Sequence, residues 1–380
     1  MVPLTRAHFR RLLGSCSARA GAGSMAGMEF AVSGTVRPPA PVGPGAHIRL
    51  VSPAMPTISY IPERAHRAER VLRDHGYSVS YGANAFQVSA DGMTAGTAEQ
   101  RAADLMAAFA DPTVDVVFAS DAGQGSQDLL DLLDADVIAA NPKPFVGYCD
   151  NVYLNLFLAR RAGISSLYGI SHMVHIGEAG GAYPETLRHL AGALASDEPL
   201  VCEAMPDRTG ALIDWYVPES ERQPRGRDIP GGWTWLRPGT ARGPLWGGEV
   251  SVLPDLVAKF DLDLAGAVLF WDISYHGLPV GPLFEALCER VDLTRLAGML
   301  VGAHPLMPLP EWAGLVGRLV DRFLPAADYP IVVNTDLGHT CPSWIVPYGE
   351  EVSLAADRIV FPRRQTKPLL LTNTLKGSKQ

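Results

Sequence analysis

The sequence predicts an α/β protein built on a parallel sheet, followed by a second, smaller and mixed domain that is rich in β-strands. Short apolar segments of β type alternate with segments in which apolar residues recur at helical spacing, and the links between them are short. Such alternation favours parallel strands with helices on both faces of the sheet. The chain of 380 residues, 47% of them hydrophobic, is long enough for two domains of ordinary size.

The alternation is clearest in residues 46–200, which we expect to form the first domain. Thr97 is placed to cap a helix that ends before Asp111-Pro112. The expected helices cover residues 62–75, 97–110, 127–133 and 151–162, and the expected strands cover residues 48–51, 77–81, 114–119 and 144–148.

The rhythm is lost after residue 179, and Pro, Gly and charged residues gather in residues 218–230, which predicts a linker or exposed loop. Short strands at residues 267–270 and 330–333 then indicate a second domain over residues 205–365. Residues 1–45 combine scattered arginines with a Pro-rich stretch and contain no apolar signal-peptide core, so a disordered leader is expected there. Residues 366–380 are expected to be a tail.

Composition argues against several classes of protein. A net charge of −8 disfavours nucleic acid as a partner, because phosphate contacts need clustered Lys and Arg. No apolar run approaches the roughly 20 residues needed to cross a bilayer, so no membrane association is expected. The five cysteines are widely spaced and form no CxxC pair, which fits a reducing, cytoplasmic location.

The segment that ends in Gly147-Tyr148-Cys149 carries the strongest chemical signal. An apolar strand runs into Cys149, and a helical segment begins at once, as in a nucleophile elbow. A helix N-terminus favours the thiolate, and neighbouring backbone N–H groups can hold an oxyanion. The segment alone also allows Cys149 to be a small buried core residue.

The Gly-rich turn at residues 120–126 follows the strand at residues 114–119 in the same way. Such a turn can present backbone N–H groups to an anion, but it equally fits an ordinary tight turn. It lacks the GxxxxGK[ST] pattern, so a nucleotide-binding loop is not supported.

Two further residues stand at the ends of expected strands. His339 follows the strand at residues 330–333 and suits acid–base chemistry at neutral pH. Asp272 ends the strand at residues 267–270 and can orient an imidazole, although a strand-end Asp also caps turns. His172 and His175 compete with His339, either as a metal pair or as part of a solvated turn.

Taken in order, these motifs resemble the LD-carboxypeptidase family, which includes murein tetrapeptide carboxypeptidases and the self-immunity peptidases of microcin C producers. The resemblance spans residues 47–362 and rests on many ordered matches. Among them are Asp111-Pro112, Ala122-Gly123, the run from Gly147 to Asp150, Tyr168-Gly169, Gly338-His339 and Pro347-Tyr348-Gly349.

The resemblance implies a Rossmann-like N-terminal domain, a β-rich C-terminal domain, a homodimer, and no metal or other cofactor. It also implies a triad in which Cys149 stands at the position of the family's serine, Asp272 at that of its glutamate, and His339 at that of its histidine. The backbone N–H groups of Gly123 and Asp150 are expected to hold the oxyanion.

The chain departs from the family pattern around this expected site. Ala122 precedes Gly123 where an Arg-Gly-Gly type of turn is usual, and Glu249 follows Gly248 where the family has a Gly-Gly-Asn turn. We therefore expect Ala122, Gly248 and Glu249 to shape a substrate pocket unlike that for a murein peptide. Trp246 is a candidate to stack on a planar substrate group, with core packing as the alternative.

The sequence thus predicts a cysteine-dependent hydrolase that cleaves an amide or related acyl bond in a small peptide-like substrate. A thioester intermediate also favours transfer to amines. A biosynthetic acyltransferase or cyclase that uses the same acyl-enzyme is therefore a second hypothesis. A non-catalytic homologue that only binds its ligand is a third.

Overall fold

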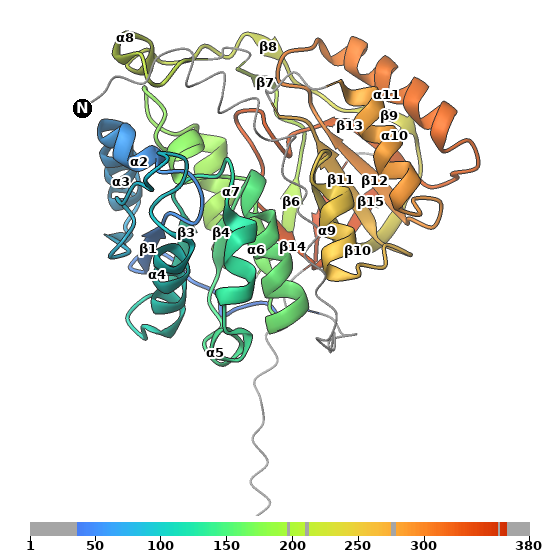
Figure 1. Cartoon of the computed structure of the whole chain (residues 1–380). Coiled ribbons are helices and arrows are strands. Elements are labelled where there is room, and N and C mark those ends of the chain that lie inside the picture. Colours follow the sequence, from blue (N-terminus) through green and yellow to red (C-terminus); the bar gives the residue numbers. More distant parts are fainter. Residues whose placement is uncertain (1–35, 196–197, 210–212, 275–278, 356–357, 363–380) are drawn as a thin grey trace, which may run out of the picture.

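Two sheets organise the protein, one built mainly from each half of the chain, and helices pack around both of them (Figure 1). The computed structural model describes residues 36–195, 198–209, 213–274, 279–355 and 358–362. The expected leader and tail lie outside these residues, apart from residues 36–45. None of the described helices combines the length and the apolar composition that crossing a membrane requires.

The first sheet has six strands, and five of them are parallel. Its order places the first and third strands side by side, so the topological switch point lies between them, where open α/β sheets bind ligands. From one edge to the other the strands are β14 (Val346–Tyr348), β5 (Ser166–Tyr168), β4 (Phe145–Gly147), β3 (Val116–Ala119), β1 (His47–Val51) and β2 (Ser78–Tyr81).

The second sheet is mixed and has eight strands. Its four central strands are parallel, and antiparallel strands flank them on both sides. The order is β6 (Leu200–Cys202), β16 (Arg358–Phe361), β15 (Glu351–Ala355), β10 (Ala241–Glu249), β11 (Val268–Asp272), β12 (Gly298–Gly302), β13 (Ile331–Thr335) and β9 (Thr234–Arg237). A small ribbon of β7 (Asp207–Arg208) and β8 (Ile229–Pro230) stands apart.

The helices that cover the first half are α2 (Thr57–Tyr60), α3 (Pro62–Asp74), α4 (Ala98–Ala110), α5 (Ala135–Ala140), α6 (Val152–Phe157) and α7 (Pro184–Ala195). Those of the second half are α8 (Pro218–Glu221), α9 (Leu253–Phe260), α10 (Val280–Arg290) and α11 (Leu309–Phe323). Short 3-10 or π turns occur at Ser126–Leu132, Cys149–Asn151, Leu158–Ala162 and His172–Ile176.

The α/β fold class predicted from the sequence is confirmed, with a parallel-stranded first sheet and a mixed second sheet. The predicted cap is also present, because the Thr97 hydroxyl accepts the Gln100 backbone N–H at 3.3 Å and the Gln100 side chain accepts the Thr97 N–H at 2.9 Å. The helix expected at residues 127–133 is present, but it is not an α-helix. That segment is a 3-10 helix, which starts after the left-handed residue Gly125.

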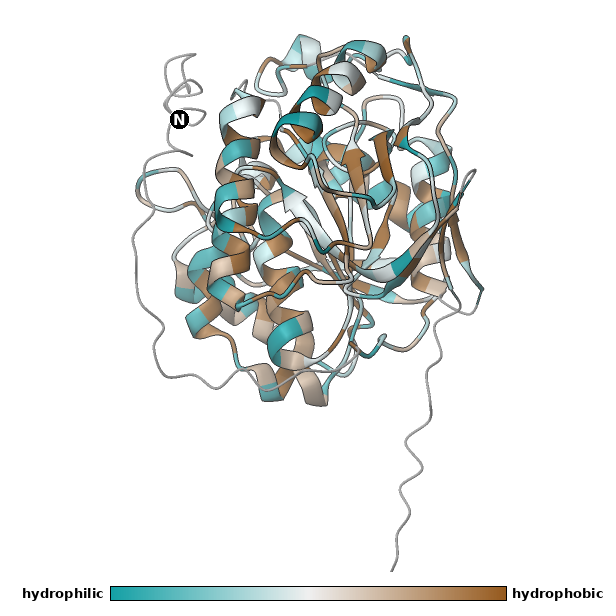
Figure 2. Cartoon of the chain, turned by 90° about the vertical axis from the view of Figure 1, so that its right-hand side faces the viewer, coloured by the Kyte–Doolittle hydropathy of each residue, from teal (hydrophilic) through white to brown (hydrophobic). Residues whose placement is uncertain are grey.

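The two halves share strands and a core. β14, from the C-terminal part of the chain, pairs with β5 in the first sheet, and β6, at the end of the first segment, pairs with β16 in the second. A single cluster of buried apolar residues contains side chains from both halves, Val152 and Trp271 among them. Apolar residues concentrate on the central strands (Figure 2).

The sequence suggested a linker or exposed loop at residues 218–230, but the structure buries part of this segment. Glu221 is buried and pairs with Arg64 of α3, while Arg225 pairs with the buried Glu178. Arg64, which is fully buried, also reaches Glu178 at 3.2 Å. These ion pairs attach the segment to the first half of the molecule.

A second buried ion pair holds the loop that follows β13. The guanidinium of Arg208 donates to the Asp336 carboxylate at 2.8 Å and to the Asn334 carbonyl at 2.6 Å. Asp336 also accepts the Met205 N–H at 3.0 Å and the Trp233 indole N–H at 3.1 Å. This carboxylate therefore fixes the loop that leads to His339.

Replacing Arg208 with Met tests this anchor. Because the substitution leaves Asp336 buried without its cation, the free energy of unfolding should fall by about 3 kcal/mol, as measured by urea denaturation. Arg242→Met is the matched control, since Arg242 pairs with Glu351 at the surface with 68% of its side chain exposed, and it should change stability little. Equal losses in the two variants would contradict the assigned role.

Candidate active site

Cys149 stands at a strained turn between β4 and a short helix. Its φ is +51°, in the left-handed region that a residue with a side chain rarely adopts. Such strain is kept only where the surroundings impose it, and it is concentrated at functional sites. The sharp strand-to-helix bend predicted at Cys149 is thus present in the backbone. The backbone alone does not assign a chemical role to this residue.

Three polar contacts fix the bend. Asp150 accepts the Ser126 N–H at 2.8 Å, the Asn151 side chain donates to the Ser126 hydroxyl at 3.0 Å, and the Tyr148 N–H donates to the Asn151 side chain at 3.3 Å. Ser126 belongs to the turn after β3, so the two Gly-containing turns of the first sheet are connected side by side. Burial raises the pKa of Asp150, and the Ser126 hydrogen bonds oppose that rise.

His339 and Asp272 are in direct contact. The Asp272 carboxylate, which is fully buried at the end of β11, accepts the backbone N–H of His339 at 2.9 Å and also contacts its ring Nδ1. One carboxylate oxygen therefore holds both the loop and the imidazole. This leaves Nε2 as the ring nitrogen not engaged by the carboxylate.

A glycine permits this close approach. Gly338 has a φ of +120°, and a Cβ placed on it would lie 2.4 Å from the Asp272 Oδ2 atom. Gly302 is similarly crowded, since its Cβ would lie 2.7 Å from the Cβ of Asp272. The Gly338-His339 pair in the sequence therefore has a steric reason that the sequence alone does not reveal.

The Cys149 thiol lies within interaction range of the His339 ring, because each group shifts the pKa of the other. Burial raises the pKa of the Cys149 thiol, and the interaction with His339 lowers it in part. For His339 burial lowers the pKa, but the Asp272 carboxylate and Cys149 outweigh burial, so the pKa lies well above its ordinary value. The interaction between the two groups thus favours transfer of the thiol proton to the imidazole.

An aromatic side chain covers the imidazole. The Tyr148 ring lies 4.9 Å from the His339 ring and 5.0 Å from the ring of His175, measured between centroids. No role was expected for Tyr148 from the sequence, although this residue immediately precedes Cys149. Its position between two histidines could be recognised only once their packing was known.

His172 and His175 are buried core residues, so the expectation of a solvated turn is wrong. Burial lowers the pKa of His172 to about 3, and it lowers that of His175 well below its ordinary value. Both rings are therefore neutral at physiological pH. Within the described part of the chain no group of three or more His, Cys, Asp or Glu residues has the arrangement of a metal site.

The residues expected to hold an oxyanion flank the bend. Asp150 follows Cys149 directly at the start of the short helix, and Gly123, with a φ of +106°, lies in the turn after β3. Met55 covers that turn, since its N–H donates to the Ala122 carbonyl at 3.2 Å and its sulfur would lie 2.0 Å from a Cβ on Gly123. The oxyanion role of the two N–H groups remains a prediction.

The remaining residues expected to bind substrate occupy β10. Trp246 is 7% exposed and packs edge-on against Tyr348 with ring centroids 5.4 Å apart, in keeping with the alternative of core packing. A Cβ on Gly248 would lie 3.3 Å from Val152 of α6, so this glycine lets the two halves approach. Glu249 is paired in register with Asp272 of β11.

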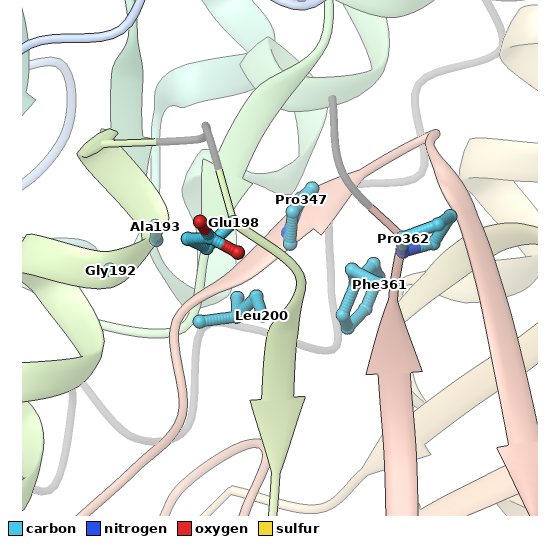
Figure 3. A pocket seen from close by; sticks show the side chains of 7 residues that line it. All are labelled: Gly192, Ala193, Glu198, Leu200, Pro347, Phe361 and Pro362. Atoms are coloured by element: carbon cyan, nitrogen blue, oxygen red, sulfur yellow. The ribbon is translucent and has the colours of Figure 1, made fainter. Parts of the chain in front are cut away.

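A small cavity lies elsewhere, between α7 and the strands β14 and β16 (Figure 3). Its volume of about 10 Å³ is sufficient for about one water molecule. It is therefore too small for a substrate. The residues that line it are Gly192, Ala193, Glu198, Leu200, Pro347, Phe361 and Pro362.

Comparison with known proteins identifies the family. Residues 48–169 match the LD-carboxypeptidase N-terminal domain, and residues 242–354 match the LD-carboxypeptidase C-terminal domain. The chain therefore belongs to the LD-carboxypeptidase family, as its motifs indicated.

Individual relatives agree. The chain is 29% identical to a putative carboxypeptidase of Streptomyces coelicolor, over 84% of this chain and 93% of the relative. It is 26% identical to a probable murein peptide carboxypeptidase of Bacillus subtilis, over 83% and 91% of the two chains. With the microcin C7 self-immunity protein MccF of Escherichia coli the identity is 21%, over 84% and 93%.

Solved structures share the fold. The wild-type apo form of MccF superimposes with a TM-score of 0.76 at 20% identity, over 86% of this chain and 98% of that protein. An MccF-like protein from Bacillus anthracis gives a TM-score of 0.74 at 22% identity, over 86% and 99% of the two chains. The two-sheet architecture is thus that of this family.

Replacing Gly338 with Ala tests the close approach to Asp272. The added methyl group would collide with the carboxylate and displace His339, so alkylation of Cys149 by iodoacetamide at pH 7 should slow by about tenfold. Gly232→Ala is the matched control, because Gly232 has a similar φ of +123° but no atom within 4 Å of an added Cβ. If both variants alkylate like the wild type, the steric argument fails.

The pH dependence of Cys149 alkylation tests the coupling to His339. Since burial raises the thiol pKa, the wild-type rate should keep rising with pH beyond the range of an ordinary thiol. His339→Ala removes the interaction that lowers this pKa, so the rate at pH 7 should fall further. Peptide mass spectrometry would follow Cys149 alone, with the exposed His66→Ala variant as control. A faster reaction in His339→Ala would refute the coupling.

Proposed function

We propose that the protein hydrolyses an amide or related acyl bond of a small peptide-like molecule through a Cys149–His339–Asp272 triad. The observation that supports this proposal most strongly is the direct contact of His339 with the buried Asp272 carboxylate, together with the effect of Cys149 and His339 on each other's pKa. The strained backbone at Cys149 adds to it, because strain there has no evident packing benefit. Membership of a carboxypeptidase family supports the reaction class.

The proposed reaction has two halves. His339 takes the thiol proton while the Cys149 sulfur attacks the acyl carbon, and a C–S bond forms. Collapse of the tetrahedral intermediate breaks the C–N bond, and His339 returns the proton to the leaving amine. Water then attacks the thioester with His339 as base, the C–S bond breaks, and the thiol is restored together with a carboxylic acid.

Asp272 orients the His339 imidazole in this scheme. By accepting from the Nδ1 side, it keeps the lone pair of Nε2 directed at the sulfur and stabilises the imidazolium that forms. Asp272 is one methylene shorter than glutamate, and the absence of a side chain at Gly338 permits the close approach of this short carboxylate to the loop of His339. The fit of the short carboxylate supports an intact site rather than a decayed one.

The names of relatives bear on the substrate. Curated relatives are called murein peptide carboxypeptidases, and MccF has been captured with glutamyl sulfamoyl guanosine and with aspartyl sulfamoyl adenosine. Small aminoacyl or peptidyl conjugates are therefore the class we propose to screen first. A thiolate nucleophile favours activated acyl groups such as thioesters over unactivated amides.

Intact-protein mass spectrometry tests the nucleophile. Incubation with a thioester of a small acyl group should add the acyl mass to the wild type, and the adduct should be absent from Cys149→Ala. Turnover in His339→Ala should fall by about 10²- to 10⁴-fold, the contribution typical of a general base. Cys288→Ala controls for the other partly exposed described cysteine. An adduct that persists in Cys149→Ala would overturn the proposal.

The same acyl-enzyme permits transfer to an amine, because aminolysis of a thioester is rapid. The use of a thiol as nucleophile is the feature that favours this second candidate. Product analysis with and without an added primary amine separates the two. An amide product that outcompetes the free acid at millimolar amine would indicate an acyltransferase or cyclase.

A further inference from the structure

Glu249 is a second carboxylate beside the triad that the proposed mechanism does not use. It ends β10, and its register partner in the neighbouring parallel strand β11 is Asp272. Side chains of register partners in parallel strands point to the same face of the sheet. The carboxyl ends of β10 and β11 thus place two acidic groups side by side.

The two oxygens of Glu249 have different surroundings. Oε2 accepts the backbone N–H of Ser251 at 2.9 Å and also contacts the Ser251 hydroxyl. Oε1 is buried and has no hydrogen-bond partner among the described residues, in a residue only 5% exposed. Burying a carboxylate oxygen without a hydrogen-bond donor costs free energy. A ligand that donates a hydrogen bond to Oε1 would offset this cost.

No cation of the described chain neutralises this group. Glu249 forms no ion pair with a described lysine or arginine. Two buried arginines pair with other carboxylates, Arg208 with Asp336 and Arg101 with Asp128. His339 is the positive group that lowers the pKa of Glu249, but that ring is already held by Asp272. While both carboxylates are ionised, they outnumber the one imidazolium, and the site carries net negative charge.

Glu249 also acts on the reacting atoms. Its charge raises the pKa of the Cys149 thiol, after the larger effect of burial, which places the carboxylate within electrostatic reach of the sulfur. Burial, and then the charge of Asp272, raise the pKa of Glu249 itself, while Ser251 and His339 oppose that rise. A bound cation would oppose these electrostatic effects, and it would lower the pKa of both Glu249 and Cys149.

We propose that Glu249 selects substrates that carry an ammonium group next to the scissile acyl carbon and disfavours substrates that carry a carboxylate there. The free Oε1 atom accepts an N–H of the ammonium, while Ser251 holds the other oxygen in place. This inference rests on the proposed Cys149 chemistry and names the substrate class of that same site.

A matched series of three thioesters tests the selection. Alanyl, lactyl and methylmalonyl thioesters of N-acetylcysteamine share the CH3–CH–C(=O) unit and differ in the substituent on its central carbon, which is an ammonium, a hydroxyl or a carboxylate. In each, Cys149 attacks, the old C–S bond breaks, a new one forms, and the released thiol takes the proton from His339. The rate of acyl-adduct formation at pH 6.5 is followed by intact mass.

The wild type should react with the alanyl ester at least about tenfold faster than with the lactyl ester, and slowest with the methylmalonyl ester. Glu249→Gln should reduce the alanyl preference to near unity. Glu351→Gln, the same change at an exposed carboxylate of β15, should keep the wild-type preference. If Glu249→Gln fails to fold, the wild-type ratios are divided by the ratios for the same three esters with free N-acetylcysteine, and an alanyl preference must remain after this correction.

Other results would overturn the inference. Equal wild-type rates, or a preference that survives in Glu249→Gln, would refute selection by Glu249 while leaving the cysteine chemistry intact. A methylmalonyl ester that reacts fastest would show that Glu249 is a protonated donor to carboxylates. No adduct on Cys149 with any of the three esters would refute the proposed function itself, and the inference with it.

Discussion

The contact between Asp272 and His339 is the interaction on which the arrangement of the site depends. It joins the end of β11 to a loop 67 residues later in the chain, and both partners are buried, so a loss of either leaves an unpaired polar group in the interior. The surrounding sequence is shaped to allow it. Gly338 and Gly302 remove side chains that would collide with the carboxylate, and Asp336 anchors the loop to Arg208.

The bend at Cys149 is supported from both halves of the molecule. Asp150 and Asn151 bind Ser126 in the turn after β3, while Gly248 of β10 lets the second sheet approach α6, the helix that the bend begins. The sulfur and the imidazole therefore come from different halves whose relative position is set by a shared apolar core. Strand exchange through β14 and β6 reinforces that position.

Much of this arrangement could be predicted from the sequence. Periodicity located the parallel strands and the capped helix at Thr97, because these features depend on local pattern. The 3-10 form of the helix at Ser126–Leu132 was not expected, since its start is fixed by Gly125 and by the distant Asp150. α7 was missed because Pro184 and Gly192 weaken the helical signal, although proline is compatible with a first turn.

The same reason explains which residues of the site could not be predicted from the sequence. Cys149, Asp272 and His339 were marked by strand ends, a property of local sequence, and by resemblance to the family. Tyr148, Arg208 and Ser126 support them through contacts between segments far apart in the chain, and no local pattern identifies such contacts. Trp246 shows the converse, because an aromatic residue among glycines suggested a stacking surface, whereas Tyr348 occupies its edge.

The acidic residue Glu249 is one departure of this chain from the expected family pattern. A Gly-Gly-Asn turn offers a neutral amide, which can both donate and accept, whereas Glu249 only accepts while it is ionised. Its neighbour Asp272 already supplies the negative charge that the imidazole needs. A second buried carboxylate therefore adds nothing to the orientation of His339 and opposes thiolate formation at Cys149. That cost has a physical justification only if the substrate brings positive charge, because its arrival would neutralise Glu249 and favour the reactive thiolate in the same event.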